Sequence, residues 1–193
     1  MSLNDVLMTG PKLQDDIFEL LIRFRFFKIP LKADICKMFR QIEVAESHRD
    51  FQRIVWRESS DVPIKHYRLN TVTYGTSCAP YLAKRVLQQL CIDEADNLPV
   101  AAKVAANDIY MDDLVSGEFT LPKALSLQKN AIELLKRGGF DLRKWSSSYS
   151  EILESVSPDM REIQVPLSFD ESDSIKALGI RWHPTTDLFQ YKV

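Results

Sequence analysis

Two adjacent carboxylates in the middle of the chain are the residues best suited to chemistry. Asp112 and Asp113 lie within residues 107–117, where short apolar runs flank them on both sides. This pattern predicts a β-hairpin with both acids at or beside its turn. Neighbouring residues of one strand point to opposite faces, but that alternation breaks at a turn, so both carboxylates can reach one point. They would repel each other there unless a cation lay between them. An ordinary solvated turn is the alternative, because Asp is a common turn residue.

A third acid, Asp34, lies in an apolar stretch at residues 31–39 that begins like a strand. Asp is depleted in strands. An acid among apolar neighbours is costly to bury unless it is paired or bound to a metal. A structural Asp that caps the turn after the strand and a metal ligand both fit this position.

A loop of small residues, 74–80, precedes a helix that we expect to begin at Tyr81 and end near Cys91. Its glycine, serine and proline argue against a regular element. Such a loop before a helix N-terminus lets the phosphates or sugar of a ligand approach the backbone closely. It is also a common way to start a helix, so alone it indicates little.

Hydrophobic periodicity indicates which elements position these groups. Apolar residues at helical spacing predict helices over 12–28, ended by Pro30, and over 122–137, ended by Gly138-Gly139. Thr9 or Gly10 is the expected cap of the first helix. Strands are expected over 51–57, 65–73, 140–145, 162–169, 175–182 and 188–193.

This order of elements predicts an α+β domain with helices on one face of a mostly antiparallel sheet. In a split β-α-β-β-α-β arrangement, the strand with Asp34 lies beside the hairpin with Asp112. Three carboxylates from distant parts of the sequence would then come together.

Composition limits the function classes. The chain has 193 residues, 45% of them hydrophobic, which fits a soluble globular domain with a real core. A net charge of −2 gives no whole-protein argument for nucleic-acid binding, so a basic surface would have to be local. Three separated cysteines without a CxxC pair indicate neither a disulfide framework nor a zinc site, and favour a reducing intracellular setting. No apolar run approaches the ~18 residues of a membrane span.

An acid at a strand end, a small-residue loop before a helix and a Tyr-Met-Asp-Asp hairpin, in this order, resemble the palm of a reverse transcriptase. The detail resembles the BEL/Pao class of LTR retrotransposons, from about residue 3 to residue 182. The segments that carry the resemblance are Leu3-Asn4-Asp5-Val6-Leu7, Thr9-Gly10-Pro11, Leu21-Ile22-Arg23-Phe24-Arg25, Ala33-Asp34-Ile35-Cys36-Lys37-Met38-Phe39 and Gly138-Gly139-Phe140-Asp141-Leu142-Arg143-Lys144-Trp145.

The resemblance implies an RNA-directed DNA polymerase that transfers a nucleotide from a dNTP to the 3′-hydroxyl of a DNA primer on an RNA or DNA template. Asp34 and Asp112 would hold two Mg²⁺ ions, for which Mn²⁺ could substitute. The carbonyl of Ile35 would be a further ligand, and Asp113 a supporting acid. Magnesium prefers hard oxygen ligands, so carboxylates suit it.

The resemblance also implies how the incoming nucleotide is bound. Phe39 would lie under its sugar and leave no room for a 2′-hydroxyl. Gly75 and Pro80 match a loop that packs on the nucleotide and template, and Tyr74 stands where retroviral enzymes carry glutamine. Lys144, or its neighbour Arg143, would place a positive charge near the leaving pyrophosphate.

Primer contacts are implied for Tyr110 and Met111 of the hairpin and for Leu178 and Gly179, because residues 178–180 resemble a primer grip. A glycine there permits close approach of a nucleic-acid backbone, although a β-bulge would explain it equally well.

We expect one truncated domain, with a fingers helix in 1–30, a palm in 31–145, and the palm end with a primer-grip-like hairpin in 146–193. Related enzymes carry a longer fingers segment, a thumb, RNase H and integrase, so the chain is expected to be a fragment. The family implies a cytoplasmic particle or the nucleus as its location.

Two other functions fit the sequence. A non-catalytic relic or co-opted palm module would bind nucleic acid or protein. A nucleotidyl cyclase-like enzyme would use the same acids on a free nucleotide, but the 74–80 loop and the primer-grip-like segment argue against it.

Overall fold

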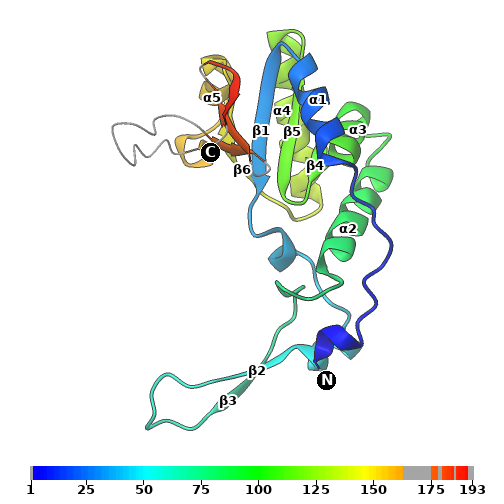
Figure 1. Cartoon of the computed structure of the whole chain (residues 1–193), viewed down its shortest axis with the longest axis vertical. Helices are drawn as coiled ribbons and strands as arrows, with labels where there is room; N and C mark the ends of the chain where they lie inside the picture. Colours follow the sequence, from blue (N-terminus) through cyan, green and yellow to red (C-terminus); the bar gives the residue numbers. More distant parts are fainter. Residues whose placement is uncertain (1, 163–174, 178–179, 185, 191–193) are drawn as a thin grey trace. The chain divides into compact units, whose positions relative to one another are not determined.

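The computed structural model describes residues 2–162, 175–177, 180–184 and 186–190 (Figure 1). The chain forms two compact units, each built from two separated segments. One unit comprises Met1–Leu13 and Lys37–Val86, and the other Gln14–Cys36 and Leu87–Val193. The expected fingers segment, 1–30, and the expected palm segment, 31–145, therefore each contain residues of both units.

The larger unit is built on a four-stranded antiparallel sheet in the order β4-β5-β1-β6. An α+β architecture with an antiparallel sheet is thus confirmed. The first strand lies between the third and the fourth, so the strand with Asp34 lies beside the hairpin, as the sequence predicts. The strands are β1 (Ile29–Ile35), β4 (Ile109–Tyr110), β5 (Asp113–Glu118) and β6 (Leu142–Ser146).

Both faces of this sheet are covered, so six of the seven residues of β1 are buried. Ser116 of β5 donates a hydrogen bond from Oγ to Asp108 of α3 at 2.7 Å, so this face is turned toward α3. Val115, its neighbour in β5, points to the opposite face and packs with Phe24 of α1 and with Trp182. The expected placement of all helices on one face is therefore wrong for α1. These helices are α1 (Ile17–Phe26), α3 (Pro99–Asp108) and α4 (Leu121–Arg137).

Helix α1 is shorter than the 12–28 expected. It begins after Asp16, whose side chain accepts a hydrogen bond from the Phe18 N–H at 2.7 Å, so the cap is neither Thr9 nor Gly10. The helix has already ended at Phe26, and Pro30 lies inside β1.

Helix α3 was not expected at all. Asn107 and Asp108 were expected to lead a strand into the hairpin, but they form the last turn of this helix, which leaves only two residues for β4. Three alanines, Ala101, Ala102 and Ala105, are its buried face. Alanine is the strongest helix former, but it gives only a weak apolar period.

Helix α4 agrees with the sequence prediction. Helix α2 (Ala79–Asp93) is longer than expected and buries Ala79, Ala83, Leu87 and Cys91, whereas Val86 is exposed. The expected pairing of 175–182 with 188–193 is found between β8 and β9. The single strand expected over 175–182 is wrong, because β7 and β8 are two strands that pair antiparallel. Leu178 and Gly179 lie outside the described residues, as does most of the strand expected over 162–169. The remaining elements of this unit are α5 (Ser150–Glu154), η4 (Pro158–Met160), β7 (Ile175–Ala177), β8 (Ile180–His183) and β9 (Leu188–Gln190).

The smaller unit contains short 3₁₀ helices and a two-stranded hairpin. The hairpin pairs Arg53 with Arg68 and Trp56 with Lys65 at its two ends, as the sequence predicts. All eight of its strand residues are exposed. The elements are η1 (Leu3–Asp5), η2 (Met38–Gln41), η3 (Glu46–Gln52), β2 (Arg53–Trp56) and β3 (Lys65–Arg68).

Candidate functional site

Strand pairing brings the three acids of the larger unit together. Asp34 of β1 lies directly opposite Asp113 of β5, so their side chains project from the same face of the sheet. Residues paired in this way have β-carbons about 5 Å apart. Asp112 is held beside them, because its carbonyl oxygen accepts a hydrogen bond from the Ile35 N–H at 2.7 Å.

The hairpin turn consists of Met111 and Asp112. Met111 has φ +55°, which is unfavourable for a residue with a side chain. Gln14 stabilises this conformation from outside the hairpin. Its Oε1 accepts a hydrogen bond from the Met111 N–H at 3.2 Å, and its Nε2 donates one to the Ile109 carbonyl at 3.3 Å. Sequence reasoning missed Gln14, since a lone glutamine ahead of a helix carries no signal.

Each acid of the facing pair has an ammonium partner. Lys32 Nζ lies 3.3 Å from Asp113 Oδ1, and Lys144 Nζ lies 3.2 Å from Asp34 Oδ2. The Lys32 side chain is only 4% exposed, whereas that of Lys144 is 55% exposed. Repulsion between the carboxylates is therefore offset here by two lysines of the chain. Lys32 was also missed, although its spacing of two residues from Asp34 places both on one face of a strand.

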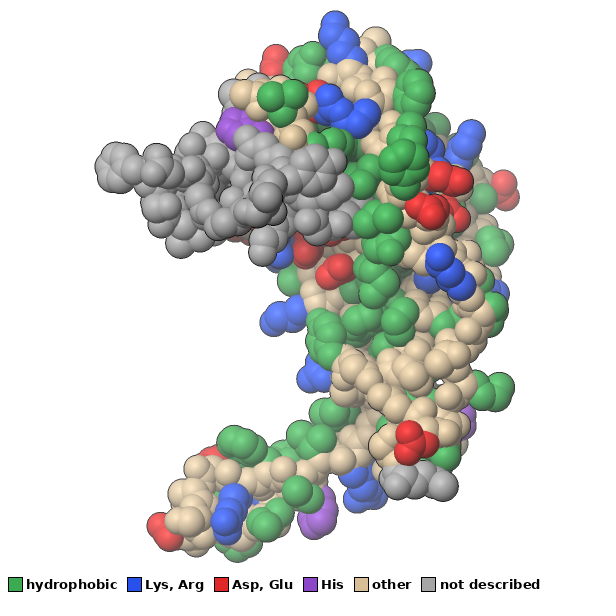
Figure 2. All heavy atoms as spheres, viewed as in Figure 1, with side chains coloured by type: hydrophobic (Ala, Val, Ile, Leu, Met, Phe, Trp, Pro, Cys, Tyr) green, Lys and Arg blue, Asp and Glu red, His purple; other side chains and the backbone are tan. Residues whose placement is uncertain are grey.

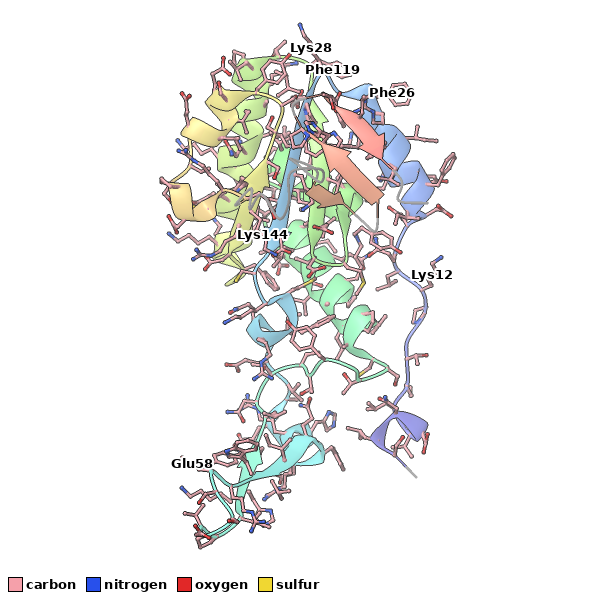
Figure 3. All side chains as sticks on the ribbon, turned by 60° about the vertical axis from the view of Figure 1, so that its left-hand side comes forward. Lys12, Phe26, Lys28, Glu58, Phe119 and Lys144 are labelled. Atoms are coloured by element: carbon pink, nitrogen blue, oxygen red, sulfur yellow. The ribbon has the colours of Figure 1, made fainter. Side chains whose placement is uncertain are left out.

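A bulge in β6 directs Lys144 toward Asp34. Strand β6 pairs Ser146 with Lys32 and Arg143 with Asp34, so it contains one residue more than the facing segment of β1. Lys144 lies in this bulge with φ +54°, near the end of β1 (Figure 3). Bulges redirect side chains in this way. Of the two cations that the sequence singled out, Lys144 faces the acids.

Arg143 is engaged elsewhere. Its guanidinium lies 3.3 Å from Asp159 and 3.6 Å from Asp141, and neither of these belongs to the acidic cluster.

A fourth acid, Glu162, adjoins the cluster. Its backbone N–H donates a hydrogen bond to the Trp145 carbonyl at 3.0 Å, which places it beside Lys144 along β6. Its Oε2 is buried and has no hydrogen-bond partner among the described residues. Burial raises the pKa of Glu162. The charges of two lysines, Lys32 and Lys144, oppose this rise, while those of the facing aspartates add to it.

The same charges set the pKa values of the other groups. Burial raises the pKa of Asp113, and the negative charges of Asp112 and Asp34 add to the rise, whereas Lys32 opposes it. Burial alone would lower the pKa of Lys144. The hydrogen bond and charge of Asp34 outweigh this effect, so the pKa of Lys144 is raised.

The donor set suits a hard divalent cation. The three aspartates and the Ile35 carbonyl supply only oxygen ligands, as Mg²⁺ prefers. Within the part of the chain that the structure describes, no three or more His, Cys, Asp and Glu side chains are already grouped to hold a metal ion. A cation that binds Asp34 or Asp113 has to compete with the ammonium group that already pairs with that carboxylate.

The residues implied for nucleotide binding lie in the smaller unit, apart from Lys144. Phe39 contacts Tyr74 edge to face, with ring centroids 5.1 Å apart and an interplanar angle of 78°. Gly75 has φ +82°, a conformation that favours glycine. Pro80 lies in the first turn of α2.

Asn4 holds this loop from both sides. Its Nδ2 donates a hydrogen bond to the Gly75 carbonyl at 2.8 Å, and its Oδ1 accepts one from the Ser77 N–H at 2.9 Å. Sequence reasoning did not assign this role to Asn4.

Among the described residues, no helix is long and apolar enough to cross a membrane. Models of known protein families and curated proteins were compared with the chain, and none of them matches it. Its function therefore has to be inferred from the residues of the site.

Proposed function

We propose that the chain is a palm-type nucleotidyltransferase domain, an RNA-directed DNA polymerase of the kind found in BEL/Pao retrotransposons. Its substrates would be a dNTP and the 3′-hydroxyl of a DNA primer paired to an RNA or DNA template. One observation carries the proposal: Asp34 and Asp113 face each other at the end of two paired strands, with Asp112 held beside them in the turn.

Two Mg²⁺ ions, when bound, would supply an activated primer hydroxyl and a neutralised triphosphate. The carboxylates of Asp34 and Asp112 would hold them. Asp112 is exposed, so its carboxylate is accessible. Asp113 would support Asp34, and the ammonium group of Lys32 opposes the rise in the pKa of Asp113 that burial causes.

Lys144 would act on the leaving group. Its side chain reaches the acids from an exposed position, and its raised pKa keeps it protonated at neutral pH. A protonated ammonium can stabilise the charge that develops on the departing pyrophosphate.

Primer extension tests the proposal. The whole chain is incubated with an oligonucleotide primer on an RNA template, the matching dNTP and Mg²⁺. We expect extension, and we expect its rate to fall by at least about a hundredfold in Asp112→Asn, because a ligand charge is lost. Asp96→Asn, which changes an exposed acid of the same unit, is the matched control. No extension by the unsubstituted chain, or full activity of Asp112→Asn, would refute the proposal.

The hairpin of the smaller unit favours a second candidate, a non-catalytic module that binds nucleic acid. Pairing places Ile54, Tyr67, Trp56 and Lys65 on one face of the hairpin. Figure 2 shows hydrophobic and basic side chains exposed along this segment. An isolated two-stranded hairpin is marginally stable in water. Aromatic and basic side chains together suit the bases and phosphates of a single strand.

Anisotropy of a labelled single-stranded oligonucleotide tests this candidate. Trp56→Ala and Lys65→Gln should each weaken binding by about tenfold, because a base-stacking surface or a phosphate contact is lost. Phe119→Ala, which removes another exposed ring, is the control. Binding that depends on the hairpin, in a chain that extends no primer, would favour the second candidate over the polymerase.

A further inference from the structure

A divalent cation that binds the acids competes with Lys144, the lysine that pairs with Asp34. Lys144 Nζ lies 3.2 Å from Oδ2 of Asp34, an acid that would hold a divalent cation. An ammonium group that leaves its carboxylate takes either solvent or another carboxylate as its new partner. This inference rests on the proposed function, because it concerns the same acids.

The sheet places Glu162 where it can be that partner. Strand β1, with Asp34, lies on one side of β6. The segment with Glu162 lies on the other, since Arg161 forms a parallel bridge with Trp145 and the Glu162 N–H bonds the Trp145 carbonyl. Lys144, the residue before Trp145, therefore belongs to a strand that lies between the segments that carry the two carboxylates.

Glu162 also has the capacity to accept an ammonium. Its Oε2 is buried and forms no hydrogen bond with any described residue. A buried carboxylate oxygen without a donor is destabilising. Both Lys32 and Lys144 act electrostatically on Glu162, which agrees with its place beside the cluster.

The two lysines differ in their freedom to move. The Lys32 side chain is 4% exposed in the centre of the sheet, so it is fixed on Asp113. The Lys144 side chain is 55% exposed and rises from a bulge, so it can change partner without disturbing the sheet.

We propose that Glu162 is a positioning residue, which receives the ammonium group of Lys144 when a divalent cation takes its place on Asp34. The exchange keeps Lys144 ordered beside the acids while the cation is bound. It also makes cation binding dependent on a residue that does not contact the cation.

Binding of Mn²⁺ to the whole chain, measured by the electron paramagnetic resonance signal of free Mn²⁺, tests this exchange. Glu162→Gln should weaken Mn²⁺ binding by about tenfold, because a charge-assisted hydrogen bond to the displaced ammonium is lost. Glu162→Asp should restore part of the affinity. Lys144→Met should strengthen binding, since no ammonium competes for Asp34.

The decisive comparison is made in the Lys144→Met background. There Glu162→Gln should change Mn²⁺ affinity less than twofold, because no ammonium remains to be received. Asp159→Asn, at an exposed acid that pairs with Arg143, is the matched control. Without Mn²⁺, the thermal stability of Glu162→Gln should not fall, which separates positioning from a structural role.

Three outcomes would overturn the inference. An equal loss of affinity from Glu162→Gln in both backgrounds would mean that Glu162 acts on the cation directly. No loss in either background would mean that it plays no part. Absence of Mn²⁺ binding by the unsubstituted chain would refute the two-metal proposal as well. Mn²⁺ binding whose affinity does not change when Glu162 is substituted would refute only the proposed role of Glu162.

Discussion

Lys32→Met is the substitution that most directly tests the charge balance of the acidic cluster. Methionine keeps the apolar stem but removes the ammonium group that lies 3.3 Å from Asp113 Oδ1. Removing one partner of a fully buried ion pair lowers the free energy of unfolding by about 3–5 kcal/mol, because the other charge stays buried without its partner. The Asp113 side chain is 21% exposed, so we take the lower end and expect a loss of about 3 kcal/mol at pH 7.

The dependence of this loss on pH has a definite sign. The pKa of Asp113 is already raised in the folded chain, and Lys32 opposes the rise, so Lys32→Met raises it further. A carboxyl whose pKa is higher when folded stabilises the fold below its unfolded pKa, near 4, and that contribution is lost as the pH rises through the folded value. The free energy of unfolding of the variant should therefore be closest to that of the unsubstituted chain at pH 4, and the difference should be largest at pH 7.

Urea unfolding, followed by the fluorescence of the buried Trp145 and Trp182, measures these differences in the larger unit. Lys129→Met, at an exposed position of α4, should change the free energy of unfolding by less than about 0.5 kcal/mol. Adding Asp113→Asn to Lys32→Met should recover part of the loss. A loss below 0.5 kcal/mol at pH 7, or a greater loss at pH 4 than at pH 7, would refute the reasoning.

Three further substitutions test other parts of the structure. Gly117→Ala should lower the free energy of unfolding by about 2 kcal/mol, because its β-carbon would lie 2.5 Å from the Ile29 carbonyl oxygen; unchanged urea unfolding would contradict this. Gln14→Ala should cost about 1 kcal/mol and speed hydrogen exchange of the Met111 amide, which donates to Gln14 Oε1; an unchanged exchange rate would show that this bond is not formed. Under the proposed function, Phe39→Ala should reduce the ratio of dNTP to rNTP incorporation by about tenfold or more in single-nucleotide extension, since the ring would no longer exclude the 2′-hydroxyl. An unaltered ratio would contradict the nucleotide-binding role that the resemblance implies for Phe39.

The convergence of Asp34, Asp112 and Asp113 could be predicted from the sequence because it depends on strong local patterns. A strand end and a tight hairpin are marked by apolar runs and turn residues. The alternation of helices and strands then leaves few arrangements of one sheet. Once β1 pairs with β5, the facing positions of Asp34 and Asp113 follow from the register.

The elements that sequence reasoning missed have weaker local signals. Helix α3 buries alanines, so its apolar period is faint although its propensity is high. The placement of α1 depends on packing between Phe24 and Val115, and no pattern in either segment specifies which face of the sheet the helix covers.

The partners of the acids depend on register and on a single extra residue. Without the bulge in β6, strand alternation would direct Lys144 differently, and nothing in a Leu-Arg-Lys-Trp segment indicates a bulge. Glu162 lies beside Trp145 only because a segment after η4 returns to the edge of the sheet. The pairing of Arg161 with Trp145 joins two segments that share no short sequence motif, so it could not be predicted from the sequence.

The lysines also change the interpretation of the acids themselves. The sequence indicates that the carboxylates would repel each other unless a cation lay between them, but in the fold Lys32 already pairs with Asp113 and Lys144 with Asp34. This explains how the cluster can be stable before any metal ion binds, and it implies competition between ammonium groups and metal ions for the same oxygens. Because only Lys144 is exposed enough to leave, the competition should be confined to Asp34, while Lys32 keeps Asp113 in place. A cluster with one fixed and one exchangeable counter-charge can therefore bind a divalent cation without losing the pairing of β1 with β5.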